Sequence, residues 1–116
     1  MSWFKEVLTD KSRIKQNMQR IAMLINKFNR IKKMLFGTQS GAFSALSELI
    51  EDKLIKSEPK LKYILSSILR GENNQKVVLD SPHRAEEMID KLILILAEKS
   101  RLEKNTLAEK GEINGL

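Results

Sequence analysis

The residues with the clearest chemical potential are cations that gather in one stretch. Between Lys11 and Ser47 the sequence holds eight Lys or Arg residues and no Asp or Glu. On a helix that turns about 100° per residue, five of the cations fall on one arc opposite the apolar positions: Lys15, Arg20, Lys27, Arg30 and Lys33. Arg13 lies in a row with Arg20 and Lys27 down one edge of the helix, so these six cations are the candidate binding residues. Each phosphate that a cation neutralises releases condensed counterions, and a nearby carboxylate would cancel the field, so the pattern predicts a polyanion-binding face.

Two methionines, Met23 and Met34, fall within the same arc. Exposed Met is typical of a protein or membrane contact, and the arc has no aromatic residue that could stack on unpaired bases. The leading hypothesis is nucleic-acid association through the phosphate backbone, with little sequence preference. The alternative is a structural or adaptor protein, resembling viral or phage accessory proteins in composition, that binds an acidic protein partner or an anionic membrane surface through this face. A solvated face with no partner is the third interpretation.

Residue types suited to catalysis or metal binding do not form a motif in the sequence. The chain has no Cys and a single His, His83, with no carboxylates at ligand spacing beside it. It has neither a GxSxG nucleophile elbow nor a Gly-rich phosphate loop. We therefore predict a non-enzymatic binding or assembly protein, with no catalytic, cofactor-binding or metal-binding residues.

The positive charge is confined to the N-terminal part of the chain. Residues 1–47 hold nine Lys or Arg against Glu6 and Asp10, so their net charge is 9 − 2 = +7. Residues 48–116 hold twelve Lys or Arg against thirteen Asp or Glu, so their net charge is 12 − 13 = −1. No acidic surplus elsewhere in the sequence can neutralise the cations, which leaves much of their charge for solvent, counterions or a partner.

The apolar periodicity predicts an all-α fold, a small bundle of four or five helices. One long basic amphipathic helix is expected over about residues 11–36, with Gly37 at its end. Its apolar seam is interrupted at Lys32, with Leu24 and Ile31 widening it on one side. The seam residues are Ile14, Met18, Ile21, Ile25, Phe28 and Leu35. Residues 1–8 predict a separate short amphipathic helix or lid, ended by Thr9 and Asp10 as cap residues.

Two further helices are expected before the C-terminal one. The first covers about residues 41–56 and presents Glu48, Glu51 and Asp52 to solvent. The connection at 38–41 has the length of a helix-turn-helix turn, but these acids would repel phosphates and disfavour that motif. A shorter helix is expected from Ser57 to Gly71, and residues 71–80 are read as irregular.

A long C-terminal helix is predicted over about residues 82–110, because Asp80 and Ser81 can cap it and Pro82 suits its first position. Residues 111–116 are expected to form a frayed tail. Residues 92–97 are apolar on every side, so this segment should lie either at the bundle centre or at a self-association surface. The residues of that possible self-association surface are Leu92, Ile93, Leu94, Ile95 and Leu96.

The length of 116 residues predicts a single helical domain over residues 1–110. The first residues lack the apolar core of a signal peptide. The longest apolar run has six residues, and a bilayer span needs about 20. We therefore expect an intracellular, cytoplasmic protein without a transmembrane span, with peripheral membrane contact and homo-oligomerisation left open.

Overall fold

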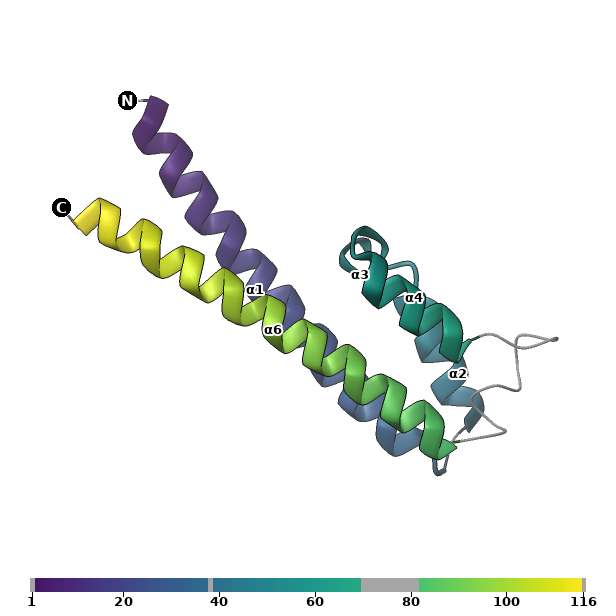
Figure 1. Cartoon of the computed structure of the whole chain (residues 1–116). Coiled ribbons are helices and arrows are strands. Elements are labelled where there is room, and N and C mark those ends of the chain that lie inside the picture. The colour runs from purple at the N-terminus through teal and green to yellow at the C-terminus, as the bar shows by residue number, and fades with distance from the viewer. Residues whose placement is uncertain (1, 38, 70–81, 116) are drawn as a thin grey trace. The chain divides into compact units, whose positions relative to one another are not determined.

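The computed structural model describes the backbone of residues 2–37, 39–69 and 82–115, and the side chains of residues 10–37, 41–69 and 82–109. The regular structure within these ranges is helical, which confirms the predicted all-α class (Figure 1). The helices in these ranges are α1 (Ser2–Met34), α2 (Gln39–Leu49), α3 (Lys53–Ser57), α4 (Pro59–Ile68) and α6 (Pro82–Gly115). The chain divides into two compact units, one formed by Met1–Ile25 with Leu96–Leu116 and the other by Asn26–Ile95.

Helix α1 is continuous from Ser2 to Met34, so the expected break at Thr9 and Asp10 is wrong. Neither residue prevents a helix, since Thr and Asp cost only tenths of a kcal/mol relative to Ala in a helix interior. The Asp10 carboxylate instead accepts a hydrogen bond from the Arg13 guanidinium one turn on, at 3.3 Å. The side chains of residues 1–9 lie outside the described part, so a lid formed by residues 1–8 stays a prediction.

The apolar seam of α1 follows a heptad rhythm that is uninterrupted from Ile21 to Leu35. Leu24 and Ile31 are each only 2% exposed, whereas Ile25 is half-buried. The buried positions therefore step by three and four from Ile21 to Leu35 and pass beside Lys32, as expected for a coiled-coil-like contact. The buried residues of α1 are Ile14, Ile21, Leu24, Phe28 and Ile31, and Leu35 directly after the helix continues the seam. The sequence pattern assigned Ile25 to the core and left Leu24 and Ile31 at its side. This choice produced the predicted interruption at Lys32, which the structure does not show.

Most of the buried side chains belong to the unit Asn26–Ile95. Besides Phe28, Ile31 and Leu35 from the α1 segment, its core contains residues from all the remaining helices. They are Ala42, Leu46, Leu49, Leu54, Ile55, Leu61, Leu65, Ile68, Ala85, Ile89 and Leu92. Within this unit α6 runs antiparallel to the end of α1, because Lys32 pairs with Asp90 at 2.5 Å and Phe36 contacts His83. This is the helix hairpin that a bundle core requires.

The predicted helix over 41–56 is divided into two at residues 50–52. Asp52 has an extended conformation, with φ −63° and ψ 136°, and its carboxylate accepts a hydrogen bond from the backbone N–H of Leu54 at 2.9 Å. Asp52 is therefore the N-cap of α3. Ser57, where the next helix was expected to begin, belongs to α3 and donates its hydroxyl to the Leu54 carbonyl, and α4 begins at Pro59 after Glu58.

We expect Asp52→Ala to lower the free energy of unfolding by about 1 kcal/mol, because the Leu54 N–H at the start of α3 loses its acceptor. Asp52→Asn should keep most of the stability, since the Asn side chain also caps well. Urea unfolding followed by circular dichroism measures both. Equal losses for the two variants would contradict the capping role.

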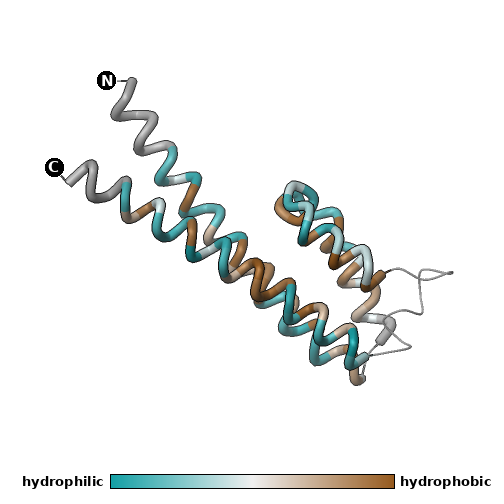
Figure 2. The backbone as a smooth tube through the Cα atoms, viewed as in Figure 1, coloured by the Kyte–Doolittle hydropathy of each residue, from teal (hydrophilic) through white to brown (hydrophobic). Residues whose placement is uncertain are grey.

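Helix α6 begins at Pro82 as predicted but continues through Gly111 to Gly115. The residues that could cap it, Asp80 and Ser81, and the segment expected to be irregular lie outside the described part. The apolar residues of α6 gather near its middle (Figure 2). Leu92 and Leu96 are fully buried, but Leu94 is 69% exposed, so this segment is not enclosed on every side as a bundle centre would be, and the self-association alternative stays a prediction. None of the described helices is long and apolar enough to cross a membrane.

Candidate polyanion-binding face

All six predicted cations of α1 have exposed side chains. Arg13 forms an ion pair with Asp10 at 3.3 Å, and both side chains remain solvent-accessible. The other five form no ion pair with any residue in the described ranges. The face therefore presents charge that the rest of the described chain does not neutralise.

The N-terminal part of this face carries Arg13, Lys15, Arg20 and Met23, all within residues 10–25. Arg13 and Arg20 are seven residues apart and follow the same edge of the helix, next to buried Ile14 and Ile21. Met23 is 59% exposed, one turn after Arg20. The side chains here form an accessible, predominantly cationic surface with one apolar contact point.

The C-terminal part of the face has a different environment, because it borders a groove between α1 and α2. We call this the mixed-charge groove; it encloses about 520 Å³. Its lining residues are Lys27, Arg30, Ile31, Met34, Ala45, Glu48, Leu49, Glu51 and Asp52. The three carboxylates expected to face open solvent thus share a groove with Lys27 and Arg30. The sequence does contain a signal for this juxtaposition: a four-residue connection between two helices folds them back on each other.

The three carboxylates of the mixed-charge groove are held in different ways. Glu51 accepts a hydrogen bond from the Lys56 ammonium at 2.5 Å, which lowers the pKa of this carboxyl below its usual value. Asp52 caps α3 through Leu54 N–H. Glu48 is exposed. None of the three pairs with Lys27 or Arg30 across the groove, so the two signs of charge lie on opposite walls without meeting.

Lys33 lies one turn after Arg30 on α1 but does not line the mixed-charge groove. It lines a second hollow together with Lys32, Phe36 and Glu86, which is a residue of α6. Lys32 in turn pairs with Asp90 at 2.5 Å. The structure therefore does not gather the predicted cations into one cluster: they lie in an open N-terminal stretch, in the mixed-charge groove, and beside α6.

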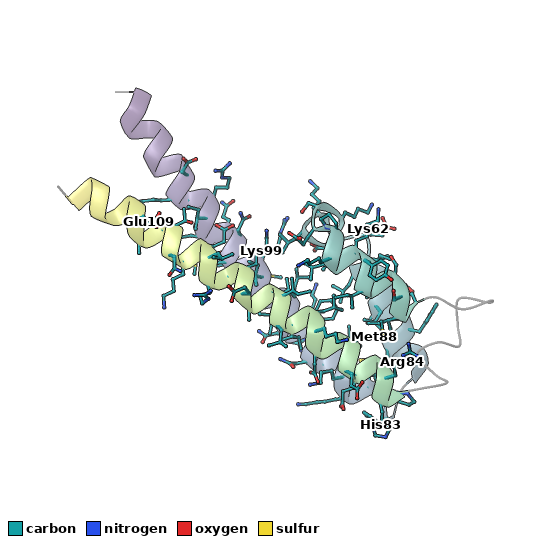
Figure 3. The ribbon with its side chains drawn as sticks, viewed as in Figure 1. Lys62, His83, Arg84, Met88, Lys99 and Glu109 are labelled. Atoms are coloured by element: carbon teal, nitrogen blue, oxygen red, sulfur yellow. The ribbon has the colours of Figure 1, made fainter. Side chains whose placement is uncertain are left out.

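His83, at the beginning of α6 (Figure 3), has a packing contact that its sequence context did not reveal. Its ring lies 5.0 Å from the ring of Phe36, measured between centroids, with an angle of 58° between the planes. Such tilted pairs are a favoured aromatic geometry. In the described residues, no group of three or more possible metal ligands is present, and no polar side chain is fully buried.

The fold and its surface define a small all-α protein with an exposed basic helix face and a mixed-charge groove at one end of that face. The chain matches no protein-family model, no curated protein and no solved structure in the three comparisons made with known proteins.

Proposed function

We propose that the protein associates with nucleic acid through the phosphate backbone, using the basic face of α1. The observation that carries this proposal is that all six cations of the face are exposed while five of them have no ion-pair partner in the described structure. Exposed Lys and Arg without carboxylate partners are what phosphate contacts and counterion release require. Backbone contacts of this kind position a protein on nucleic acid but carry no sequence information.

The individual cations should contribute unequally to phosphate binding. Lys15 and Arg20 do not line the mixed-charge groove, so its carboxylates should not weaken their attraction for phosphates. A phosphate near Lys27 or Arg30 would also meet the field of Glu48 and its two neighbouring carboxylates, which opposes binding. The N-terminal part of the face is therefore the main phosphate-binding surface in this proposal.

A second candidate function is an adaptor that binds an acidic protein partner or an anionic membrane surface. It is favoured by Met23, whose 59% exposure places an apolar side chain among the cations of the same face. A flexible Met beside basic residues suits a protein groove or a lipid headgroup region better than a row of phosphates.

The two candidates separate in a binding titration against duplex DNA, RNA and anionic liposomes at several salt concentrations. The phosphate-backbone proposal expects DNA or RNA affinity that falls steeply with salt, with liposomes ignored. Liposome binding without nucleic-acid binding would support the membrane alternative. No binding to any of the three would contradict the proposal and leave the acidic protein partner.

Charge reversal tests whether the face itself is responsible. We expect Arg20→Glu, Lys27→Glu and Arg30→Glu together to abolish binding with unchanged helicity, because all three side chains are exposed. Circular dichroism is the control for folding. A loss of helicity, or full binding by the folded triple variant, would show that these residues do not form the binding surface.

A further inference from the structure

A row of uncharged side chains runs along the middle of the exposed side of α1. Its members recur every three or four residues, which keeps them on one face of the helix, and all of them are exposed. We call this row the central stripe; it consists of Ser12, Gln16, Gln19 and Met23. The central stripe lies opposite buried Ile14, Ile21 and Leu24, so it faces away from the core.

Cations border the central stripe on both sides. At about 100° per residue, Lys15 and Arg20 lie about 140° apart around the helix, with the stripe between them. Both side chains are exposed, and neither has an ion-pair partner in the described structure. The sequence from Lys11 to Ser47 contains no carboxylate that would weaken their field. A ligand that fits this face therefore carries negative charge along two edges and uncharged hydrogen-bonding groups between them.

The major groove of duplex DNA has this arrangement. A phosphate strand borders it on each side, and base edges line its floor. Its width of about 12 Å admits an α-helix, whose diameter with side chains is about 10–12 Å. We propose that the central stripe reads base edges in this groove while Lys15 and Arg20 contact the phosphates of the two bordering strands. This inference rests on the proposed nucleic-acid binding and adds the kind of nucleic acid, duplex DNA, and a readout of its sequence.

The side chains of the central stripe determine which base pairs are preferred. A Gln amide forms two hydrogen bonds with adenine, donating to N7 and accepting from the 6-amino group. Gln16 and Gln19 are about 4.5 Å apart along the helix axis, a spacing close to the roughly 3.4 Å between neighbouring base pairs. The apolar side chain of Met23 suits contact with a thymine methyl group. The protein should therefore prefer A·T pairs at two adjacent positions.

The contact with the major groove should end near Met23. A helix in the groove reaches base edges with only about three or four side chains. Beyond Met23, Lys27 and Arg30 border the mixed-charge groove, whose carboxylates repel phosphates. The 59% exposure of Met23 thus has an explanation within nucleic-acid binding, as an apolar contact to a base.

Selection by the full chain from a duplex DNA library with a randomised central segment tests this readout. We expect the wild type to enrich duplexes with two adjacent A·T pairs. A selected duplex should bind at least about 25-fold more tightly than one with both pairs replaced by G·C, since each bidentate contact discriminates by at least about 5-fold. An RNA duplex of the same sequence should show no such preference, because side chains do not read its deep, narrow major groove.

Substitutions in the central stripe separate base readout from phosphate contact. Gln16→Ala with Gln19→Ala should remove the sequence preference and leave the salt dependence of binding unchanged, because the cations that contact phosphates are still present. Asn29→Ala with Asn105→Ala removes two exposed amides outside the stripe and is the matched control, which should keep the preference. Gln19→Arg should change the preferred pair at one position from A·T to G·C, since Arg pairs with guanine O6 and N7.

The outcomes distinguish this inference from the function on which it rests. Circular dichroism confirms that each variant is folded. Salt-dependent binding of the wild type without any enriched sequence overturns the base readout and leaves the phosphate-backbone proposal standing. A preference that persists in the folded Gln16→Ala, Gln19→Ala variant, or that is equal on an RNA duplex, also overturns the base readout. Absence of binding to any nucleic acid overturns both proposals.

Discussion

Phe28→Ala is expected to lower the free energy of unfolding by about 3–5 kcal/mol, the range found when a buried Phe is truncated and a cavity remains. Phe28 has no exposed surface and lies in the seam of α1 between Leu24 and Ile31, which are also buried. It belongs to the unit that holds most of the buried side chains. The loss should therefore appear in a single cooperative transition when urea unfolding is followed by circular dichroism.

Met23→Ala on the same helix is the matched control for that experiment. Met23 is 59% exposed, and its truncation should change stability by no more than about 0.5 kcal/mol. Ile31→Val, a smaller truncation of a buried residue, should cost about 0.5–1.5 kcal/mol and covers the case in which Phe28→Ala does not fold. A loss at Met23 as large as that at Phe28 would show that the seam is assigned to the wrong side of α1.

The fold could be predicted from the sequence wherever a local pattern decides the structure. Apolar spacing gave the two long helices, and Pro82 marked the start of α6 correctly. The register of the seam was less certain, because Ile25 and Leu24 are equally apolar and only the packing shows which is buried. The cap at Asp52 was missed because Glu48, Glu51 and Asp52 also fit a continuous amphipathic helix.

The candidate site was predictable in part for the same reason. The exposure of the cations follows from the helical period alone, since they lie opposite the buried seam. The position of Glu48, Glu51 and Asp52 beside Lys27 and Arg30 depends on how two helices pack, which the period of either helix does not determine. The charge count along the sequence assigned these acids and the cations to separate parts of the chain, whereas in space they line the same groove.

Replacing Lys15 and Arg20 by Gln should reduce the salt dependence of duplex DNA binding. Each phosphate contact contributes about 0.9 to the slope of log affinity against log salt, so the double variant should lose about 1.8 from the slope. At 0.1 M salt this corresponds to a loss on the order of 50-fold in affinity. Both side chains are exposed and have no ion pair in the described structure, so their removal leaves no unpaired carboxylate. Fluorescence anisotropy with a labelled duplex measures the slope.

Two further double variants with the same change in net charge show whether the position of the cations or the total charge of the protein determines the salt dependence of DNA binding. Lys60→Gln with Lys62→Gln, on exposed positions of α4, should leave the slope unchanged, because these residues are not on the α1 face. Lys27→Gln with Arg30→Gln should change it less than the Lys15 and Arg20 pair does, since nearby carboxylates keep phosphates away. Equal decreases for all three pairs would mean that the protein attracts nucleic acid through its net charge alone, and the assignment of phosphate contacts to α1 would be wrong.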